Sequence, residues 1–193
     1  MHLMRNPLPQ TEHRKEIAVP DSDILVIGVG NETRGDDAVG RIAAKRLKEK
    51  LGRYATVVEE LGDGTRLLDL WRGSELTVII DAVLSGAEPG HIHRFDARES
   101  PLPAGLFHYS THSFGVPEAI ELARAMNQLP KRIIVYGIED ECFDERANLS
   151  PTVELAAQEL AELLTAEILQ HQPLTISPTQ TAAAPIYSNF HLT

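Results

Sequence analysis

Cysteine is nearly absent from this chain of 193 residues, because Cys142 is the only one. One cysteine excludes a disulfide within the chain, and it excludes a cysteine-based zinc or iron–sulfur site built by a single copy. Such a composition fits a reducing compartment, so the sequence predicts a cytoplasmic protein. Acidic residues directly precede Cys142 and disfavour its thiolate form. We therefore expect Cys142 to be dispensable for catalysis.

Long apolar runs and basic charge are also lacking. No run approaches the roughly 20 apolar residues of a membrane-spanning helix, and residues 1–20 hold no apolar stretch suited to a signal peptide. There are 18 Lys and Arg against 28 Asp and Glu, a formal net charge of −10, and no basic patch is visible. A phosphate backbone would be repelled by this charge. The sequence predicts a soluble monomer with neither a nucleic-acid nor a membrane partner.

Short apolar runs without polar alternation are typical of parallel strands that are buried on both faces. Three such runs are Ile24–Val29, Leu76–Leu84 and Arg132–Ile138, and two weaker strands are expected at residues 54–59 and 91–95. Segments with helical spacing separate or follow the strands, namely residues 38–51, 65–71, 118–127 and 151–170. The alternation predicts the α/β class, as a single three-layer domain with a mostly parallel, about five-stranded sheet and helices on both faces.

Both ends of the chain fall outside this pattern. Residues 1–22 are polar and interrupted by proline, and residues 173–193 are rich in Pro, Thr and Ala without a helical stripe. Such compositions indicate flexible extensions. We therefore expect the folded domain to span residues 23–172.

A glycine-rich segment, Gly28-Val29-Gly30-Asn31-Glu32-Thr33-Arg34-Gly35-Asp36-Asp37, follows the first strand and opens the first helix. A dinucleotide fingerprint needs glycine where Thr33 stands, and a P-loop would continue into Lys-Ser or Lys-Thr instead of two aspartates. Carboxylates repel a phosphate and attract a cation. Two alternatives remain open: Asp36 caps the first helix while Asp37 complements its dipole, or the chain is a nucleotide-binding α/β module.

Two further residues belong to the same predicted edge of the sheet. Asp81 interrupts an apolar strand, where a charge is costly unless it is paired or binds a metal, although a carboxylate that accepts loop amides would also explain it. His112 lies in a Ser/Thr/Gly-rich loop just before a helix, where most histidines are ordinary surface residues. Ligands in α/β folds bind at the carboxyl ends of the strands. Asp37, Asp81 and His112 would form there an open metal-binding shell that suits nickel or zinc.

Other chemistry has weaker support in the sequence. There is no G-x-S-x-G nucleophile elbow and no H-E-x-x-H helix, which argues against serine-hydrolase and ordinary zinc-protease chemistry. His91 and His93 share one strand face but have no evident partner, so we expect them to be solvated. Asp63 and Thr65 are expected to form a tight turn.

Taken in order, the motifs of residues 23–170 resemble those of the hydrogenase maturation endopeptidases. The matching residues are Gly28-x-Gly30-Asn31, Asp36-Asp37, Gly40, Asp81, Ser110-Thr111-His112, Gly137-Ile138-Glu139 and Leu149-Ser150-Pro151-Thr152-Val153. One motif departs from the family, which often has Asp-Gly-Gly-Thr or Asp-Ala-Gly-Thr where this chain has Gly62-Asp63-Gly64-Thr65. The acidic residue is displaced by one position, so the resemblance assigns no role to Asp63.

The resemblance implies a five-stranded α/β fold in which Asp37, Asp81 and His112 form the metal-binding site and carry out catalysis. It implies that the substrate is the large-subunit precursor of a nickel–iron hydrogenase, from which a short C-terminal extension is removed after nickel insertion. Nickel would then belong to the substrate, although another divalent metal could occupy the site. Hydrolysis could use a carboxylate that activates water, or polarisation of the scissile carbonyl by the metal. A non-enzymatic nickel carrier is a further alternative.

Overall fold

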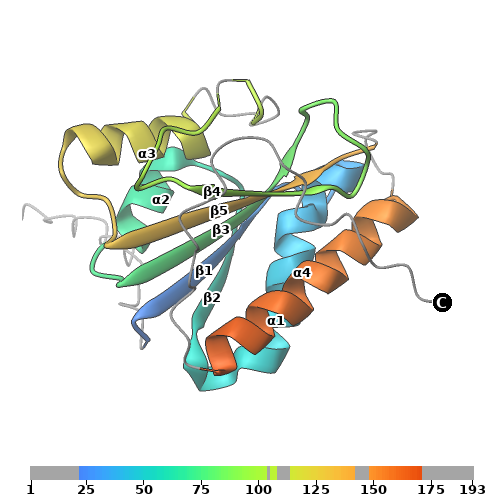
Figure 1. Cartoon of the computed structure of the whole chain (residues 1–193), viewed down its shortest axis with the longest axis horizontal. Helices are drawn as coiled ribbons and strands as arrows, with labels where there is room; N and C mark the ends of the chain where they lie inside the picture. Colours follow the sequence, from blue (N-terminus) through green and yellow to red (C-terminus); the bar gives the residue numbers. More distant parts are fainter. Residues whose placement is uncertain (1–21, 104, 108–113, 142–147, 171–193) are drawn as a thin grey trace, which may run out of the picture.

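A five-stranded sheet forms the centre of the molecule (Figure 1). The computed structural model describes residues 22–103, 105–107, 114–141 and 148–170. The strands are β1 (Ile24–Val29), β2 (Thr56–Glu60), β3 (Leu76–Val83), β4 (Ile92–Asp96) and β5 (Arg132–Glu139). They lie in the order β2-β1-β3-β5-β4, with β4 antiparallel to β5 and the other pairs parallel. The parallel strands therefore share one carboxyl edge, called here the carboxyl rim.

Helices cover both faces of this sheet (Figure 1). One face packs on α1 (Val39–Leu51) and α4 (Pro151–Leu169), and the other packs on α2 (Gly64–Leu70) and α3 (Val116–Ala125). Short 3-10 helices, η1 (Gly35–Ala38) and η2 (Gly52–Tyr54), flank α1. Alternate residues of each strand enter opposite layers: Val78 and Ile80 face α1 and α4, whereas Ile79 faces α2 and α3. The predicted three-layer α/β domain is confirmed.

The helix starts follow from local sequence. Pro151 opens α4 directly after its N-cap residue Ser150, and Pro117 lies in the first turn of α3, where a missing amide proton costs little. Glu118 accepts a hydrogen bond from the backbone N–H of Gly115 (2.9 Å) and so completes the start of α3. In the described ranges, no helix combines the length and the apolar character needed to cross a membrane.

Glycines allow α1 to lie directly on the sheet. A Cβ atom at Gly40 would stand 2.2 Å from the carbonyl oxygen of Ile80 and 2.3 Å from that of Val29. A Cβ atom at Gly30 would stand 1.8 Å from the carbonyl oxygen of Asp37, and Gly30 has a φ of 140°. Close packing of backbone on backbone thus explains these glycines without a phosphate ligand. It also brings the start of α1 against the end of β3, where Asp81 lies.

Candidate functional site

Two of the three predicted site residues lie together at the carboxyl rim. Asp37 belongs to η1 and is 8% exposed, whereas Asp81 lies near the end of β3 and keeps part of its surface open. η1 contacts β3, and Gly40 packs on Ile80, the residue before Asp81. His112 lies outside the described residues, so its place in the site stays a prediction.

The negative charge of Asp37 perturbs the ionisation of Asp81. The pKa of Asp81 is raised to about 8, chiefly by desolvation and also by the negative charge of Asp37, while a hydrogen bond from the backbone N–H of Ala82 (2.9 Å) acts to lower it. Burial also raises the pKa of Asp37, against the opposing charge of Arg34 and a hydrogen bond from the backbone of Asn31. A cation between the two carboxylates would relieve both penalties.

The chemistry of this pair fits a divalent metal. In the described part of the chain, neither Asp37 nor Asp81 forms a salt bridge, and no three His, Cys, Asp or Glu side chains are grouped so that they could hold a metal ion. The described residues therefore supply two carboxylate donors and leave further coordination positions open. A shell of this kind can add ligands to a metal that is already held by another molecule.

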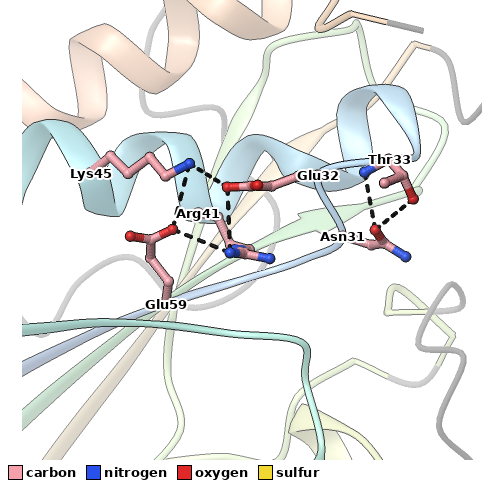
Figure 2. Close-up of polar contacts among 6 residues, drawn as sticks. All are labelled: Asn31, Glu32, Thr33, Arg41, Lys45 and Glu59. Atoms are coloured by element: carbon pink, nitrogen blue, oxygen red, sulfur yellow. Dashed lines mark hydrogen bonds and ion pairs between the residues drawn. The ribbon is translucent and has the colours of Figure 1, made fainter. Parts of the chain in front are cut away.

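The loop before Asp37 is held in place by polar contacts (Figure 2). Oδ1 of Asn31 accepts hydrogen bonds from the backbone N–H (3.0 Å) and the hydroxyl (2.8 Å) of Thr33. Glu32 forms ion pairs with Arg41 and Lys45 of α1, and both cations also reach Glu59 of β2. Loop, helix and strand are thereby joined beside the candidate site.

Asp36 does not cap the first helix, so that part of the alternative is wrong. No side chain caps η1 or α1, whose N-cap residues are Arg34 and Ala38. Asp36 is instead fully buried, and its carboxylate accepts hydrogen bonds from Ser150 and Glu141. Neighbouring aspartates thus have different surroundings: Asp36 points into the fold, whereas Asp37 is coupled to Asp81.

Glu139 forms a second buried polar group at the carboxyl rim, which sequence reasoning missed. Its Oε1 accepts the backbone N–H groups of Ser85 and Gly86 (both 2.7 Å), and its Oε2 accepts the Ser85 hydroxyl (2.8 Å) and Nε2 of His93 (3.1 Å). Burial acts to raise the pKa of Glu139, but these hydrogen bonds together hold it below its usual range. The expectation that His93 is solvated is wrong, because Glu139 binds it. His91 is only partly exposed.

Ser85, His93 and Glu139 are not a proteolytic triad. Nε2 of His93 contacts both Oγ of Ser85 (3.3 Å) and Oε2 of Glu139 (3.1 Å). A triad requires the acid on the other ring nitrogen, so that the imidazole can relay a proton from the serine. This group fastens the loop after β3 to the end of β5.

The turn predicted for Asp63 and Thr65 is confirmed. Asp63 is the N-cap residue of α2, and its Oδ1 accepts hydrogen bonds from the backbone N–H (2.8 Å) and the hydroxyl (2.7 Å) of Thr65. These contacts satisfy an amide at the start of the helix and explain the residue locally. Cys142 lies outside the described residues.

Known proteins resemble most of this chain in sequence. The family model described as hydrogenase maturation protease (HycI) matches residues 41–167. The hydrogenase expression/formation protein HupD of Thiocapsa roseopersicina is 29% identical over 154 residues, which cover 74% of this chain and 69% of that protein. The hydrogenase 2 maturation protease of Escherichia coli is 28% identical over 150 residues, covering 75% of this chain and 90% of that protein.

Solved structures agree with these sequence matches. The hydrogenase maturating endopeptidase HybD from E. coli has a TM-score of 0.64 and 25% identity, and the match covers 76% of this chain and 92% of that one. The [NiFe] hydrogenase maturation protease HybD from Thermococcus kodakarensis has a TM-score of 0.60 and 30% identity, with 74% and 97% of the two chains covered.

Proposed function

Since this chain belongs to the hydrogenase maturation protease family, we propose that it is the endopeptidase that removes the C-terminal extension of a nickel–iron hydrogenase large-subunit precursor. Membership makes it a peptidase, and its similarity to proteins named hydrogenase 2 maturation protease and hydrogenase maturating endopeptidase supports this substrate. Its single cysteine supports action in the cytoplasm, and we propose that it acts as a monomer.

We further propose that the enzyme recognises nickel already bound to the precursor. The observation that carries this step is the coupled pair of carboxylates, Asp37 and Asp81, at the carboxyl rim. Together with His112 they would add oxygen and nitrogen ligands to the nickel of the substrate. Only a nickel-loaded precursor would then be held with its scissile bond beside these side chains, so that metal insertion precedes cleavage.

The same residues have a defined part in hydrolysis. With a pKa of about 8, Asp81 keeps its proton at neutral pH until a cation approaches, and it then becomes a charged ligand. A carboxylate at the site can accept a proton from the water that attacks the scissile carbonyl carbon. The C–N bond then breaks, and the new amine leaves with a proton. Polarisation of the carbonyl by the substrate's metal is the second route to the same products.

Mass measurement of the large subunit tests this proposal. We expect purified protein to shorten a nickel-loaded precursor by its C-terminal extension and to leave a nickel-free precursor intact. Equal cleavage of both forms would contradict nickel recognition but not peptidase function. Retention of nickel by the protein without any processing of the precursor would instead identify a nickel carrier.

A further inference from the structure

Asp36 is buried beside the proposed ligand Asp37 and binds two distant parts of the chain. It is 0% exposed. Oδ1 accepts the backbone N–H of Ser150 (2.7 Å), and Oδ2 accepts the Ser150 hydroxyl (2.7 Å) and the backbone N–H of Glu141 (3.0 Å). Both carboxylate oxygens are therefore engaged by donors that lie more than 100 residues away in sequence.

These donors belong to the elements that frame the site. Glu141 follows the end of β5, and Ser150 is the N-cap residue of α4. Asp36 therefore joins η1 to β5 and α4. Hydrogen bonds to a buried, charged acceptor are strong, and a carboxylate bound by two backbone amides has little freedom to move.

Asp37 is also held through its backbone. Its N–H donates to the carbonyl oxygen of Arg34 (3.1 Å), and its own carbonyl packs on Gly30, where no Cβ atom would fit. η1 is therefore packed on Gly30, directly after β1, and is bound through Asp36 to Glu141 and Ser150. Release of Asp36 would let η1 shift and would move Asp37 relative to Asp81.

We propose that Asp36 is a positioning residue, which fixes Asp37 beside Asp81 by binding Ser150 and Glu141 so that the two can grip the metal of the precursor. The inference rests on the proposed function. Functional side chains must be held within about 0.5 Å of the productive geometry, and supporting residues of this kind typically change metal affinity or activity by about 10- to 100-fold. Asp36 touches neither substrate nor metal in this account, and it acts through Asp37.

A second long-range contact in the chain provides the matched control. Arg46 of α1 binds Glu154 of α4 through an ion pair, and its Nη1 donates to the Glu154 carbonyl oxygen (3.4 Å). This contact also joins the α1 region to α4, but Arg46 lies two turns along the helix from its start. Arg46→Met keeps the aliphatic stem and removes the contact. Its loss should lower stability without moving Asp37.

The experiment compares affinity for nickel-loaded precursor and thermal unfolding in the full-length protein, at a temperature where every variant is folded. Asp36→Asn is nearly isosteric, but its NH₂ group would face N–H donors. We expect its affinity to fall at least about tenfold, and that of Arg46→Met to stay within about twofold. In an Asp37→Asn background, Asp36→Asn should cause no further loss of affinity, because Asp36 acts through Asp37.

Each outcome decides the inference. Wild-type affinity in folded Asp36→Asn, or the same loss of affinity in Asp36→Asn and Arg46→Met, would reduce Asp36 to a structural role. If Asp36→Asn does not fold, Ser150→Ala decides, because it removes only the hydroxyl contact: reduced affinity supports the inference and unchanged affinity overturns it. Failure of the wild type to bind or cleave nickel-loaded precursor would overturn the proposed function as well.

Discussion

The carboxyl and amino ends of the parallel strands differ in how far their charged side chains are buried. At the carboxyl rim, Asp36, Asp37, Glu139 and Asp140 are at most 8% exposed. At the amino ends of the parallel strands, called here the amino edge, Lys131 pairs with Glu75 (2.8 Å). Their side chains are 75% and 50% exposed. Burial of a carboxylate is costly, whereas an exposed ion pair costs little. The costly arrangement therefore marks the functional edge.

The surface also has a cavity away from the carboxyl rim. A cavity of about 380 Å³ opens at the amino edge, between the segments that precede β3 and β5. It is lined by Trp71, Leu129 and Pro130 among others, and its charged groups include the paired Lys131 and Glu75.

The largest expected effect is at the carboxyl rim itself. Asp81→Asn is nearly isosteric and removes the charge that would bind the substrate's nickel, so cleavage of nickel-loaded precursor should fall at least about 100-fold while the protein remains folded. Precursor processing and thermal unfolding should be measured on one sample. Normal cleavage by this variant would show that Asp81 is not part of the site. The difference in burial of charge between the two ends of the strands would then have no functional meaning.

Glu139 should affect stability more than any exposed pair. Glu139→Ala leaves the amides of Ser85 and Gly86 and the ring of His93 without their acceptor, which should lower the free energy of unfolding by about 3 kcal/mol. Glu139→Gln keeps one accepting oxygen and should lose less. Urea unfolding of the two variants gives the order, and equal stability of Glu139→Ala and wild type would show that the buried contacts contribute nothing.

The buried carboxyl groups of the carboxyl rim should also make the free energy of unfolding depend on pH. The folded pKa of Asp81, about 8, lies above its ordinary value of 3.8, so the folded state binds more protons than the unfolded state between these values. The free energy of unfolding should therefore fall as pH rises through this window, and the contribution is lost above about pH 8. Asp140, with a pKa raised to about 7 by burial and by the charges of Glu139 and Asp36, acts in the same direction.

Asp81→Asn provides the control for this titration. The variant cannot titrate at position 81, so its stability should decline less steeply between about pH 5 and pH 9, and its advantage over wild type should grow with pH. Urea unfolding across this range measures the difference. Parallel curves for the two proteins would mean that Asp81 ionises normally.

The smallest effect is expected at the amino edge. Lys131→Met removes one partner of an exposed ion pair, and such pairs contribute about 0 to 1 kcal/mol. Cleavage of the precursor should stay within about twofold of wild type, because the change lies at the opposite end of the strands from Asp37 and Asp81. A large loss of cleavage in a folded Lys131→Met protein would place the functional site at the amino ends of the strands and contradict the site proposed at the carboxyl rim.

Much of this architecture could be predicted because its signals are local. Apolar runs without alternation located β1, β3 and β5 almost to the residue, and the charge of Asp81 within such a run indicated its position at a strand end. The partners of Asp36 could not be found in this way. Local reasoning favours a helix cap for an aspartate at a helix start, whereas its partner Ser150 is 114 residues distant.

The pairing of Glu139 with His93 was hidden for a similar reason. It depends on β4 running antiparallel beside β5, which places His93 opposite Gly137 and within reach of Glu139. Alternation in a short strand does not reveal its neighbour or its direction. The pairing and register of strands that are distant in sequence, rather than residue type alone, decide which buried acidic side chains form hydrogen bonds.

X-ray absorption at the nickel edge tests the central claim most directly, because it observes the metal of the substrate itself. Nickel-loaded precursor should be measured alone, with wild-type protein and with the Asp81→Asn variant. We expect wild type to add oxygen or nitrogen ligands to the nickel, and the variant to add fewer. A nickel spectrum that wild-type protein leaves unchanged, in a mixture where the precursor is demonstrably bound, would contradict recognition of the metal by Asp37 and Asp81.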